Sequence, residues 1–133
     1  MLFRSIANLI TNDIVTIHSS HIFEWHGRYD FIINTGGIKV KVEDLEKNLK
    51  LVVPYNYFVS GTPHPKWGQQ ITLIIEADAL NEIEMISITN SIGELQKIHQ
   101  PKQLWLCSKF TYTESGKLNR NESLRYITTK LNV

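Results

Sequence analysis

The spacing of apolar residues changes at Val42, and this change constrains the fold more than any other feature of the chain. Residues 38–42 alternate between apolar and lysine side chains, the pattern of a strand with one buried face. From Val42 onward, apolar residues recur at Leu45 and Leu49, which is the spacing of a helix with one buried side. We therefore predict a strand that leads directly into a helix. Two ion pairs one turn apart are expected on that helix, Glu43 with Lys47 and Glu46 with Lys50.

Further strands and helices are predicted on either side of this change. Runs rich in β-branched and aromatic residues predict strands at 14–17, 23–25, 31–33, 57–59, 71–75 and 104–106. The run Asn34-Thr35-Gly36-Gly37 is typical of a hairpin turn, because glycine adopts positive φ angles without steric cost. A second helix is expected from about Asn81 to Ile98, and a last helix is expected to begin at Asn119 and to carry Leu124, Ile127 and Leu131. Strands that alternate with helices predict an α+β or α/β fold.

Composition narrows the possible partners. The 133 residues carry a net charge of +1 with acidic and basic residues mixed, so we expect no nucleic-acid partner and no anionic-membrane partner. No apolar run approaches the roughly 20 residues that a bilayer span needs, and the first residues do not resemble a signal peptide, which predicts a soluble, cytoplasmic protein. Cys107 is the single cysteine and its neighbours are apolar, so we expect a buried, inert thiol.

Several kinds of chemistry find no support in the motifs. The five histidines lack the spacing of a metal-binding helix and have no flanking carboxylate or cysteine ligands in a known pattern, so no metal site is expected. No Gly-x-Ser-x-Gly elbow occurs, so nucleophilic hydrolysis is not indicated. Lys117 lies in a polar, exposed-looking loop where packing requires no lysine, and the Leu118 that follows it excludes a phosphate-binding P-loop. Taken alone, Lys117 is either a solvated surface residue or a residue with another chemical role.

Five short motifs resemble those of one family when they are taken in order. They are Thr11-x-Asp13, Gly27-Arg28-x-Asp30, Asn34-x-x-Gly37 with Glu43-x-x-Glu46, Gly61-Thr62-Pro63-His64-x-x-Trp67-Gly68, and Gly116-Lys117-x-x-Arg120. Over nearly the whole chain they are similar to the C-terminal end of the adenylate-forming acyl-CoA ligases, a superfamily that also includes luciferases and the adenylation domains of peptide synthetases. The resemblance implies an enzyme that converts a carboxylic acid and ATP to an acyl adenylate and pyrophosphate, and then forms the CoA thioester with release of AMP.

The resemblance also implies how the chain is organised. Residues 1–29 would be the tail of a large nucleotide-binding domain and would form a β-hairpin, and residues 30–133 would form a mobile C-terminal lid domain. The implied fold class is α+β, with the hairpin followed by a central mixed sheet of about three strands flanked by about three helices. The partners would be the large N-terminal domain, the acid, ATP and CoA. Mg²⁺ would be bound mainly by that large domain, and the isolated chain is expected to be inactive.

The resemblance implies nucleotide-binding and hinge roles for three residues. Asp13 would accept hydrogen bonds from the ribose hydroxyls of the nucleotide, a task that suits an ionised carboxylate. Arg28 would assist at the same nucleotide. Asp30 would be the hinge about which the lid turns between the two half-reactions.

Roles in the two chemical steps are implied for residues of the lid. Gly36 and Gly37 would let the backbone approach the pantetheine arm of CoA, although both also suit a plain hairpin turn. Lys117 would reach the acid carboxylate and the α-phosphate together and stabilise the charge that develops during adenylation. Arg120 and Trp67 are expected to be mainly structural, the first as an anchor at the start of a helix and the second in the core.

The acid substrate is indicated only by a local similarity. The run from Phe23 to Val40 most resembles the 2-succinylbenzoate:CoA ligases of menaquinone biosynthesis, notably in its stretch Ile33-Asn34-Thr35-Gly36-Gly37-Ile38-Lys39. Other aryl- or fatty-acyl-CoA ligases and a peptide-synthetase adenylation lid stay open, because the acid pocket belongs to the large domain. Two other classes also stay open: a module that binds nucleotides or single-stranded nucleic acid through the aromatic and basic residues near Arg28, and a purely structural subunit.

Overall fold

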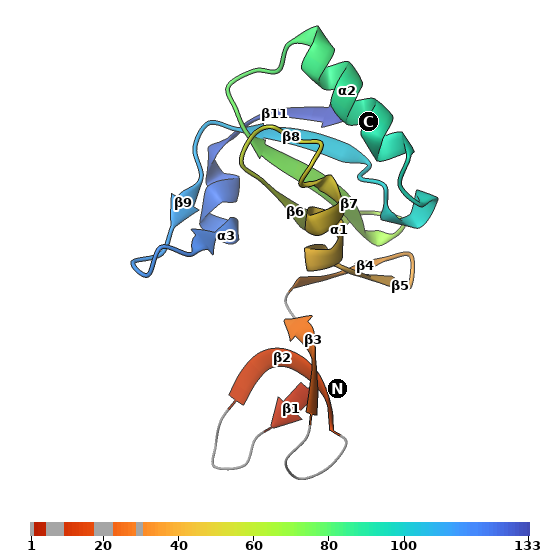
Figure 1. Ribbon diagram of the computed structural model, residues 1–133, viewed down its shortest axis with the longest axis vertical. Helices are drawn as coiled ribbons and strands as arrows, with labels where there is room; N and C mark the ends of the chain where they lie inside the picture. The colour runs from red at the N-terminus through yellow and green to blue at the C-terminus, as the bar shows by residue number, and fades with distance from the viewer. Residues whose placement is uncertain (1, 5–9, 18–22, 29–30) are drawn as a thin grey trace.

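The first strands of the chain form a small sheet of their own (Figure 1). The structure is a computed structural model that describes the backbone of residues 2–4, 10–17 and 23–28, and residues 31–133 in full. Its first sheet is antiparallel in the order β1-β2-β3, with β1 (Leu2–Arg4), β2 (Ile10–Ile17) and β3 (Phe23–Arg28). The expected hairpin is present as β2 and β3, but β1 adds a third strand to it.

A mixed six-stranded sheet organises residues 31–133, which we call the lobe. Its strands are β4 (Ile32–Thr35), β5 (Ile38–Lys41), β6 (Tyr57–His64), β7 (Gly68–Glu76), β8 (Gln103–Cys107) and β11 (Ile127–Asn132). They follow the order β11-β8-β7-β4-β5, with β6 also paired to β7, and only β7 and β8 run parallel. The predicted α+β fold with a mixed sheet is confirmed. The expected number of about three strands was too small, because β4, β5 and β11 join the same sheet.

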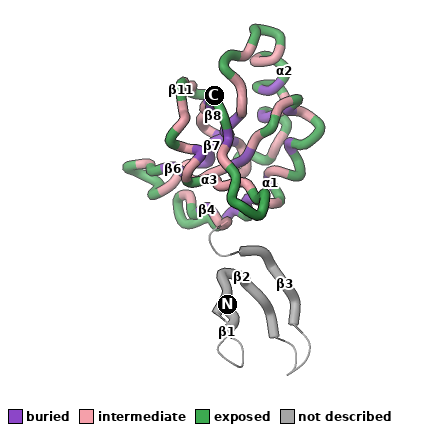
Figure 2. The backbone as a smooth tube through the Cα atoms, turned by 90° about the vertical axis from the view of Figure 1, so that its left-hand side faces the viewer, coloured by how far each residue is buried: buried purple, intermediate pink, exposed green. Residues whose placement is uncertain are grey.

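The two faces of the sheet are covered by different elements. Helices α1 (Val42–Leu49) and α2 (Glu82–Gly93) bury Leu45 and Ile88 against one face, where Leu73 of β7 also points. On the other face, Ile74 of β7 packs with Phe58 and with η4 (Leu124–Tyr126), which directly follows the short helix α3 (Arg120–Ser123). Neighbouring residues of β7 thus point to opposite faces, as the strand pleat requires. Figure 2 shows buried residues gathered along the central strands of the lobe.

Helices α1 and α2 begin as the sequence predicts. Strand β5 leads directly into α1, and Asn81 caps α2 by accepting a hydrogen bond from the Glu84 amide at 2.8 Å, while the Glu84 carboxylate accepts from the Asn81 amide at 3.0 Å. Helix α2 ends at Gly93, earlier than expected, because the interior glycine weakens the helix, and a short 3₁₀ turn, η3 (Lys97–His99), follows before Pro101. The two ion pairs expected within α1 do not form among the described residues.

The prediction of a long last helix was wrong. Only residues 120–126 are helical, and Ile127–Asn132 forms β11 at the edge of the sheet, paired antiparallel with β8. Ile127 and Leu131 fit a helical spacing, but the residues between them decide the outcome. The run Ile127-Thr128-Thr129 is β-branched throughout, and burial alternates with period two along the strand, with odd-numbered residues less exposed than even-numbered ones.

Cys107 is fully buried, as expected. Its thiol donates to the carbonyl oxygens of Lys109 at 3.0 Å and Ser123 at 3.3 Å, and burial raises the pKa of the thiol, so the reactive thiolate is disfavoured. Among the helices of the described residues, none combines the length and the apolar character that a bilayer crossing requires.

Candidate functional site

Lys117 lies at the tip of a small hairpin. Strands β9 (Thr111–Tyr112) and β10 (Leu118–Asn119) pair antiparallel, and the tip between them is closed by the Thr113 amide, which donates to the Lys117 carbonyl at 2.7 Å. Gly116 adopts a φ of +83°, a left-handed angle that a residue with a side chain rarely takes. The Lys117 amide donates to the Thr113 hydroxyl at 3.2 Å, which fixes the backbone of the lysine while its side chain stays exposed.

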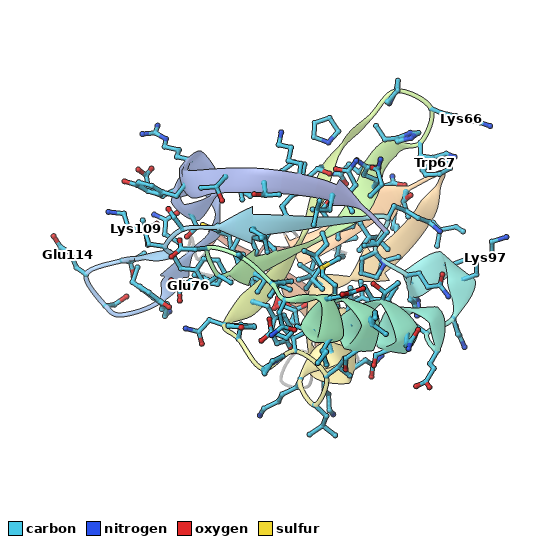
Figure 3. The ribbon with its side chains drawn as sticks, turned by 90° about the horizontal axis from the view of Figure 1, so that it is seen from above. Lys66, Trp67, Glu76, Lys97, Lys109 and Glu114 are labelled. Carbon is cyan, nitrogen blue, oxygen red and sulfur yellow. The ribbon has the colours of Figure 1, made fainter. Side chains whose placement is uncertain are left out.

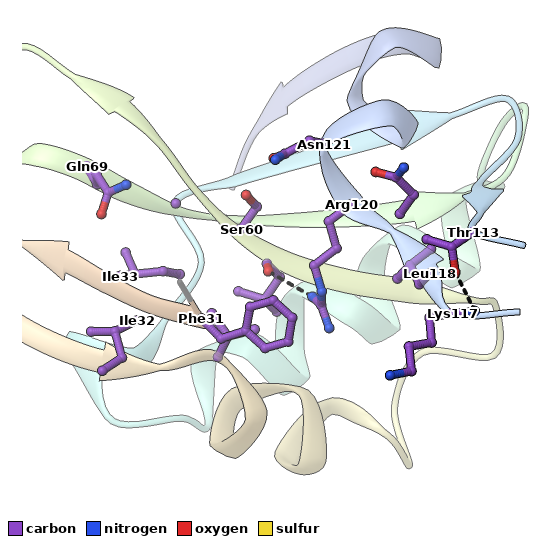
Figure 4. Close-up of a pocket in the computed structure, with 14 residues that line it drawn as sticks. Phe31, Ile32, Ile33, Ser60, Gln69, Thr113, Lys117, Leu118, Arg120 and Asn121 are labelled. Carbon is purple, nitrogen blue, oxygen red and sulfur yellow. Dashed lines mark hydrogen bonds between the residues drawn. The ribbon is translucent and has the colours of Figure 1, made fainter. Parts of the chain in front are cut away.

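An open groove runs from this hairpin to the start of the lobe (Figure 4). Lys117 and Arg120 contribute to one wall, and Phe31 and Ile33 contribute to the other. Polar side chains that also line the groove are Ser60, Gln69, Thr113, Asn119 and Asn121, and further apolar ones are Ile32, Val42, Val59 and Leu118. The groove therefore offers one exposed ammonium, several hydrogen-bonding groups and apolar side chains, a combination that suits a polar ligand with an anionic group.

Arg120 is an anchor at the start of α3, as expected. One guanidinium nitrogen lies 2.7 Å from a carboxylate oxygen of Glu46, and the other donates to the second oxygen at 3.2 Å. The guanidinium also lies over the Phe31 ring at 4.5 Å from its centroid and donates to the Val59 carbonyl at 3.4 Å. Burial raises the pKa of Glu46, and the hydrogen bond and charge of Arg120 offset part of that rise.

Gly36 and Gly37 form the turn between β4 and β5, with φ angles of +58° and +86°. The hairpin turn predicted from the sequence is therefore confirmed. The Gly36 amide donates to the Trp67 carbonyl at 2.9 Å, so this turn lies against the turn that joins β6 to β7. A methyl group on Gly37 would meet nothing within 4 Å, so its backbone faces open space on the outside of the lobe.

The expectation that Trp67 lies in the core was wrong. Its side chain is 38% exposed and stacks on the imidazole of His64, with the ring centroids 4.2 Å apart. The imidazole Nδ1 accepts the amide hydrogens of Lys66 and Trp67 at 3.1 Å each, which orders the turn. Because β6 and β7 continue as far as this turn, Trp67 is carried to the end of the sheet and away from the core.

The lysine hairpin and the glycine turn lie at opposite ends of the lobe. Figure 3 shows Glu114, at the tip of the hairpin, on one side and Trp67, next to the glycine turn, on the other. Lys117 and Gly37 therefore cannot face the same ligand while the lobe keeps one orientation.

The remaining predicted site residues lie near the N-terminus. Asp13 and Arg28 are register partners in the β2–β3 pair, so their backbones lie directly opposite each other on neighbouring strands. This register brings together the backbones of two residues that are 15 positions apart in the sequence. The side chains of both residues and the whole of Asp30 lie outside the described part of the chain.

Sequence reasoning missed the partner of Arg120. It assigned Glu46 to a pair with Lys50, whereas Glu46 is the residue that receives the Arg120 guanidinium. A signal was present, because Glu46 follows Val42 by four positions and therefore lies beside the apolar stripe of α1. A carboxylate at such a position needs a partner from another element. Also missed were Lys97 and Lys102, which line a hollow beside Gly36 and Trp67.

Comparison with known proteins finds relatives of one kind, although no protein-family model matches the chain. The chain is 26% identical over 120 residues to a medium/long-chain-fatty-acid–CoA/3-oxocholest-4-en-26-oate–CoA ligase of Mycobacterium tuberculosis, covering 86% of this chain and 22% of that protein. It is 31% identical over 102 residues to the mitochondrial malonate–CoA ligase of Mus musculus, covering 72% of this chain and 17% of that protein. The chain thus spans about a fifth of the length of these relatives.

Solved structures with the same fold are also ligases. An AMP-forming acyl-CoA synthetase-like protein from Dyadobacter fermentans matches 88% of this chain with a TM-score of 0.71 and 26% identity, over 35% of its own length. ATP-bound MatB from Rhodopseudomonas palustris matches 85% of the chain with a TM-score of 0.64 and 21% identity, over 23% of its own length. The o-succinylbenzoate CoA synthetase of Bacillus subtilis, in complex with its acyl-adenylate intermediate, matches 98% of the chain with a TM-score of 0.67 and 19% identity, over 27% of its own length. The relatives and structural neighbours of this chain are therefore AMP-forming acyl-CoA ligases, and its fold is that of the C-terminal domains of acyl-CoA synthetases.

Proposed function

We propose that this chain is the C-terminal part of an ATP-dependent carboxylate:CoA ligase. The reaction joins an acid and ATP to give an acyl adenylate and pyrophosphate, and CoA then displaces AMP to give the thioester. Residues 1–29 would be the tail of the large nucleotide-binding domain, and residues 30–133 would be its mobile lid. In this proposal the chain is inactive without the large domain and works in the cytoplasm.

One observation carries the proposal. The two parts of the lobe that resemble the family's chemical motifs, the Lys117 hairpin and the Gly36-Gly37 turn, lie at opposite ends of it. Both half-reactions act on the same carboxyl group, first at its oxygen and then at its carbon, so each end must reach one active centre in turn. A rotation of the lobe about Asp30, which precedes β4, would bring first the lysine and then the glycine turn to that centre.

Lys117 has the properties that the adenylation step needs. During this step an acid oxygen attacks the α-phosphate, and negative charge grows on the phosphate oxygens as pyrophosphate leaves. An ammonium on a long stem can lie between the two reacting anions and stabilise that charge. The described structure holds the Lys117 backbone through Thr113 and leaves its side chain exposed, so the ammonium is free to enter a site on another domain.

The other end of the lobe suits CoA. The open backbone at Gly37 would let the extended pantetheine arm pass close to the chain. The hollow beside it combines the exposed rings and aliphatic side chains of Trp67, Ile38 and Ile98 with the ammonium groups of Lys97 and Lys102. Apolar surface next to cations is complementary to a ligand that carries both an organic chain and phosphates.

The nucleotide would be bound at the boundary of the two domains. Asp13 would accept the ribose hydroxyls and Arg28 would contact the same nucleotide, and their register in β2 and β3 supports a shared role. ATP use is supported by the ATP-bound structural neighbour. Mg²⁺ would be held mainly by the large domain, where it would neutralise the phosphates of ATP.

For the acid we propose 2-succinylbenzoate, which would place the enzyme in menaquinone biosynthesis. The proposal rests on the run from Ile33 to Lys39, and the o-succinylbenzoate CoA synthetase of B. subtilis supports it at the level of the fold. The curated relatives favour a second candidate, a fatty-acid or malonate ligase, because their identity to this chain is higher.

Acid-dependent release of pyrophosphate from ATP tests the function in the full-length protein. We expect release with 2-succinylbenzoate that far exceeds release with a medium-chain fatty acid or malonate, followed by AMP and thioester formation once CoA is added. A reversed preference would replace the acid and keep the enzyme class. No release with any acid, together with tight and steeply salt-dependent binding of single-stranded DNA, would instead support the nucleic-acid-binding module.

A further inference from the structure

Arg120 has a closer connection to the chemistry than its place at a helix start suggests. We propose that Arg120 is a positioning residue, which fixes the Lys117 hairpin on the lobe by joining it to Glu46 of α1 and to the ring of Phe31. This inference rests on the proposed function, because it assigns the ion pair a task in the adenylation step.

The hairpin needs such an anchor. Strands β9 and β10 have two residues each and form a separate two-stranded sheet, with no strand pairing to the six-stranded sheet. Isolated two-stranded hairpins are marginally stable in water. The position of the Lys117 backbone therefore depends on the contacts at the base of the hairpin, and Arg120 follows β10 directly.

The contacts of Arg120 fix its orientation from several sides. One guanidinium nitrogen lies 2.7 Å from the Glu46 Oε1 as an ion pair, and the other donates a hydrogen bond to the Glu46 Oε2 at 3.2 Å. The same guanidinium donates to the Val59 carbonyl of β6 at 3.4 Å and lies over two rings, 4.5 Å from the centroid of Phe31 and 5.4 Å from that of Phe58. Figure 4 shows the guanidinium directed at the Phe31 ring, below the strand that carries Ser60.

A role in stability alone does not explain this arrangement. Desolvation raises the pKa of Glu46 and outweighs the attraction of Arg120, so the carboxylate is held in a place that disfavours its charge. A pair of this kind can often be replaced by apolar residues at little cost in stability, so we infer that this one is kept for the geometry that it fixes. The side chains of Arg120 and Glu46 are only 23% and 19% exposed, in contrast to the pair of Arg125 and Glu122, which are 75% and 41% exposed.

The Phe31 contact ties the hairpin to the entrance of the lobe. Phe31 comes directly after Asp30, the proposed hinge, and begins the chain that enters β4. Arg120 therefore connects three parts of the lobe: Phe31, which is the first residue after the hinge, helix α1, and the lysine hairpin. When the lobe turns, the Lys117 backbone would therefore keep its position relative to helix α1 and Phe31.

Substitution of Arg120 by lysine tests the inference in the full-length protein. Lysine keeps the charge but loses the planar guanidinium that contacts Glu46, the Val59 carbonyl and the Phe31 ring together. We expect Arg120→Lys to lower kcat of the adenylation step about 10- to 100-fold, the scale for misplacing a catalytic group by about 1 Å, with KM for ATP and acid nearly unchanged. Thioester formation from a presynthesised acyl adenylate should keep its wild-type rate. Arg125→Lys is the matched control and should alter neither step, because its pair with Glu122 is exposed.

A second variant keeps the test decisive if Arg120→Lys is poorly folded. Glu46→Gln removes the partner instead, and it should show the same selective loss of adenylation. The double variant should be no slower than the slower single variant, since both substitutions break one contact. An unchanged adenylation kcat, or an equal loss in both half-reactions, would overturn the inference. Failure of the proposed function is distinguishable, because the wild-type protein would then form no acyl adenylate.

Discussion

Gly37 and Gly116 offer a matched pair of backbone probes at the two ends of the lobe. Their φ angles are +86° and +83°, and a methyl group on either would meet nothing within 4 Å. Replacement by alanine therefore introduces left-handed strain without a clash, about 1–2 kcal/mol at each position. For a domain of about 100 residues this corresponds to a decrease in Tm of roughly 5–15 °C. The two variants should thus be equally destabilised in a thermal unfolding experiment.

Their effects on activity should be opposite. Gly37→Ala places a methyl group where we propose that pantetheine passes, so thioester formation should fall about tenfold or more while adenylation is retained. Gly116→Ala distorts the hairpin tip next to Lys117, so adenylation should fall while thioester formation is retained. Each half-reaction is measured at a temperature below the lowered Tm, by pyrophosphate release and by consumption of a presynthesised acyl adenylate. Equal losses of both half-reactions in both variants would refute the division of the lobe into two chemical ends.

Two further predictions concern the folded lobe. Leu104→Ala should lower the free energy of unfolding by about 2–5 kcal/mol in urea titrations, because Leu104 is fully buried in β8, whereas Leu51→Ala, at a position 98% exposed, should change it by no more than about 0.5 kcal/mol. Similar losses at both sites would contradict the placement of the core. Burial raises the folded-state pKa of Glu46 above its ordinary value of 4.5, so the stability linked to its proton is fully present below pH 4.5 and is lost as the pH rises through the raised pKa. The free energy of unfolding of Glu46→Gln should therefore increase relative to that of the wild type as the pH is raised from 4.5 toward neutrality. A difference between the two proteins that does not depend on pH would contradict a raised pKa of Glu46.

Local patterns predicted those elements whose local and tertiary preferences agree. The switch from alternating to helical spacing at Val42 produced β5 and α1, and the start expected for the second helix, about Asn81, agrees with α2, which begins at Glu82. The Gly36-Gly37 turn followed from conformational preference alone, because positive φ angles favour glycine.

Pairing between strands far apart in the sequence, or their length, decided the positions that were predicted wrongly. Residues 127–132 could satisfy a helical spacing, but they complete the edge of the sheet beside β8. Trp67 has a large aromatic side chain of the kind expected in a core, but the length of the β6–β7 hairpin places it at the surface.

The candidate site shows the same division. Lys117 stood out because a polar loop does not require a lysine, and the structure places it, exposed as expected, at the tip of the β9–β10 hairpin. The Glu46–Arg120 pair joins residues 74 positions apart, and no local pattern specifies which of several nearby charges each residue meets. Long-range partners of this kind depend on how α1 and α3 pack on the sheet.

The most direct test of the central claim is a comparison of the two half-reactions in the full-length protein with Lys117→Ala. If Lys117 supplies its charge only during adenylation, this variant should lose adenylation about 10² to 10³ fold, the scale for removing one transition-state donor. It should convert a presynthesised acyl adenylate and CoA to the thioester at the wild-type rate. Equal loss of both half-reactions, or adenylation at the wild-type rate, would contradict the claim.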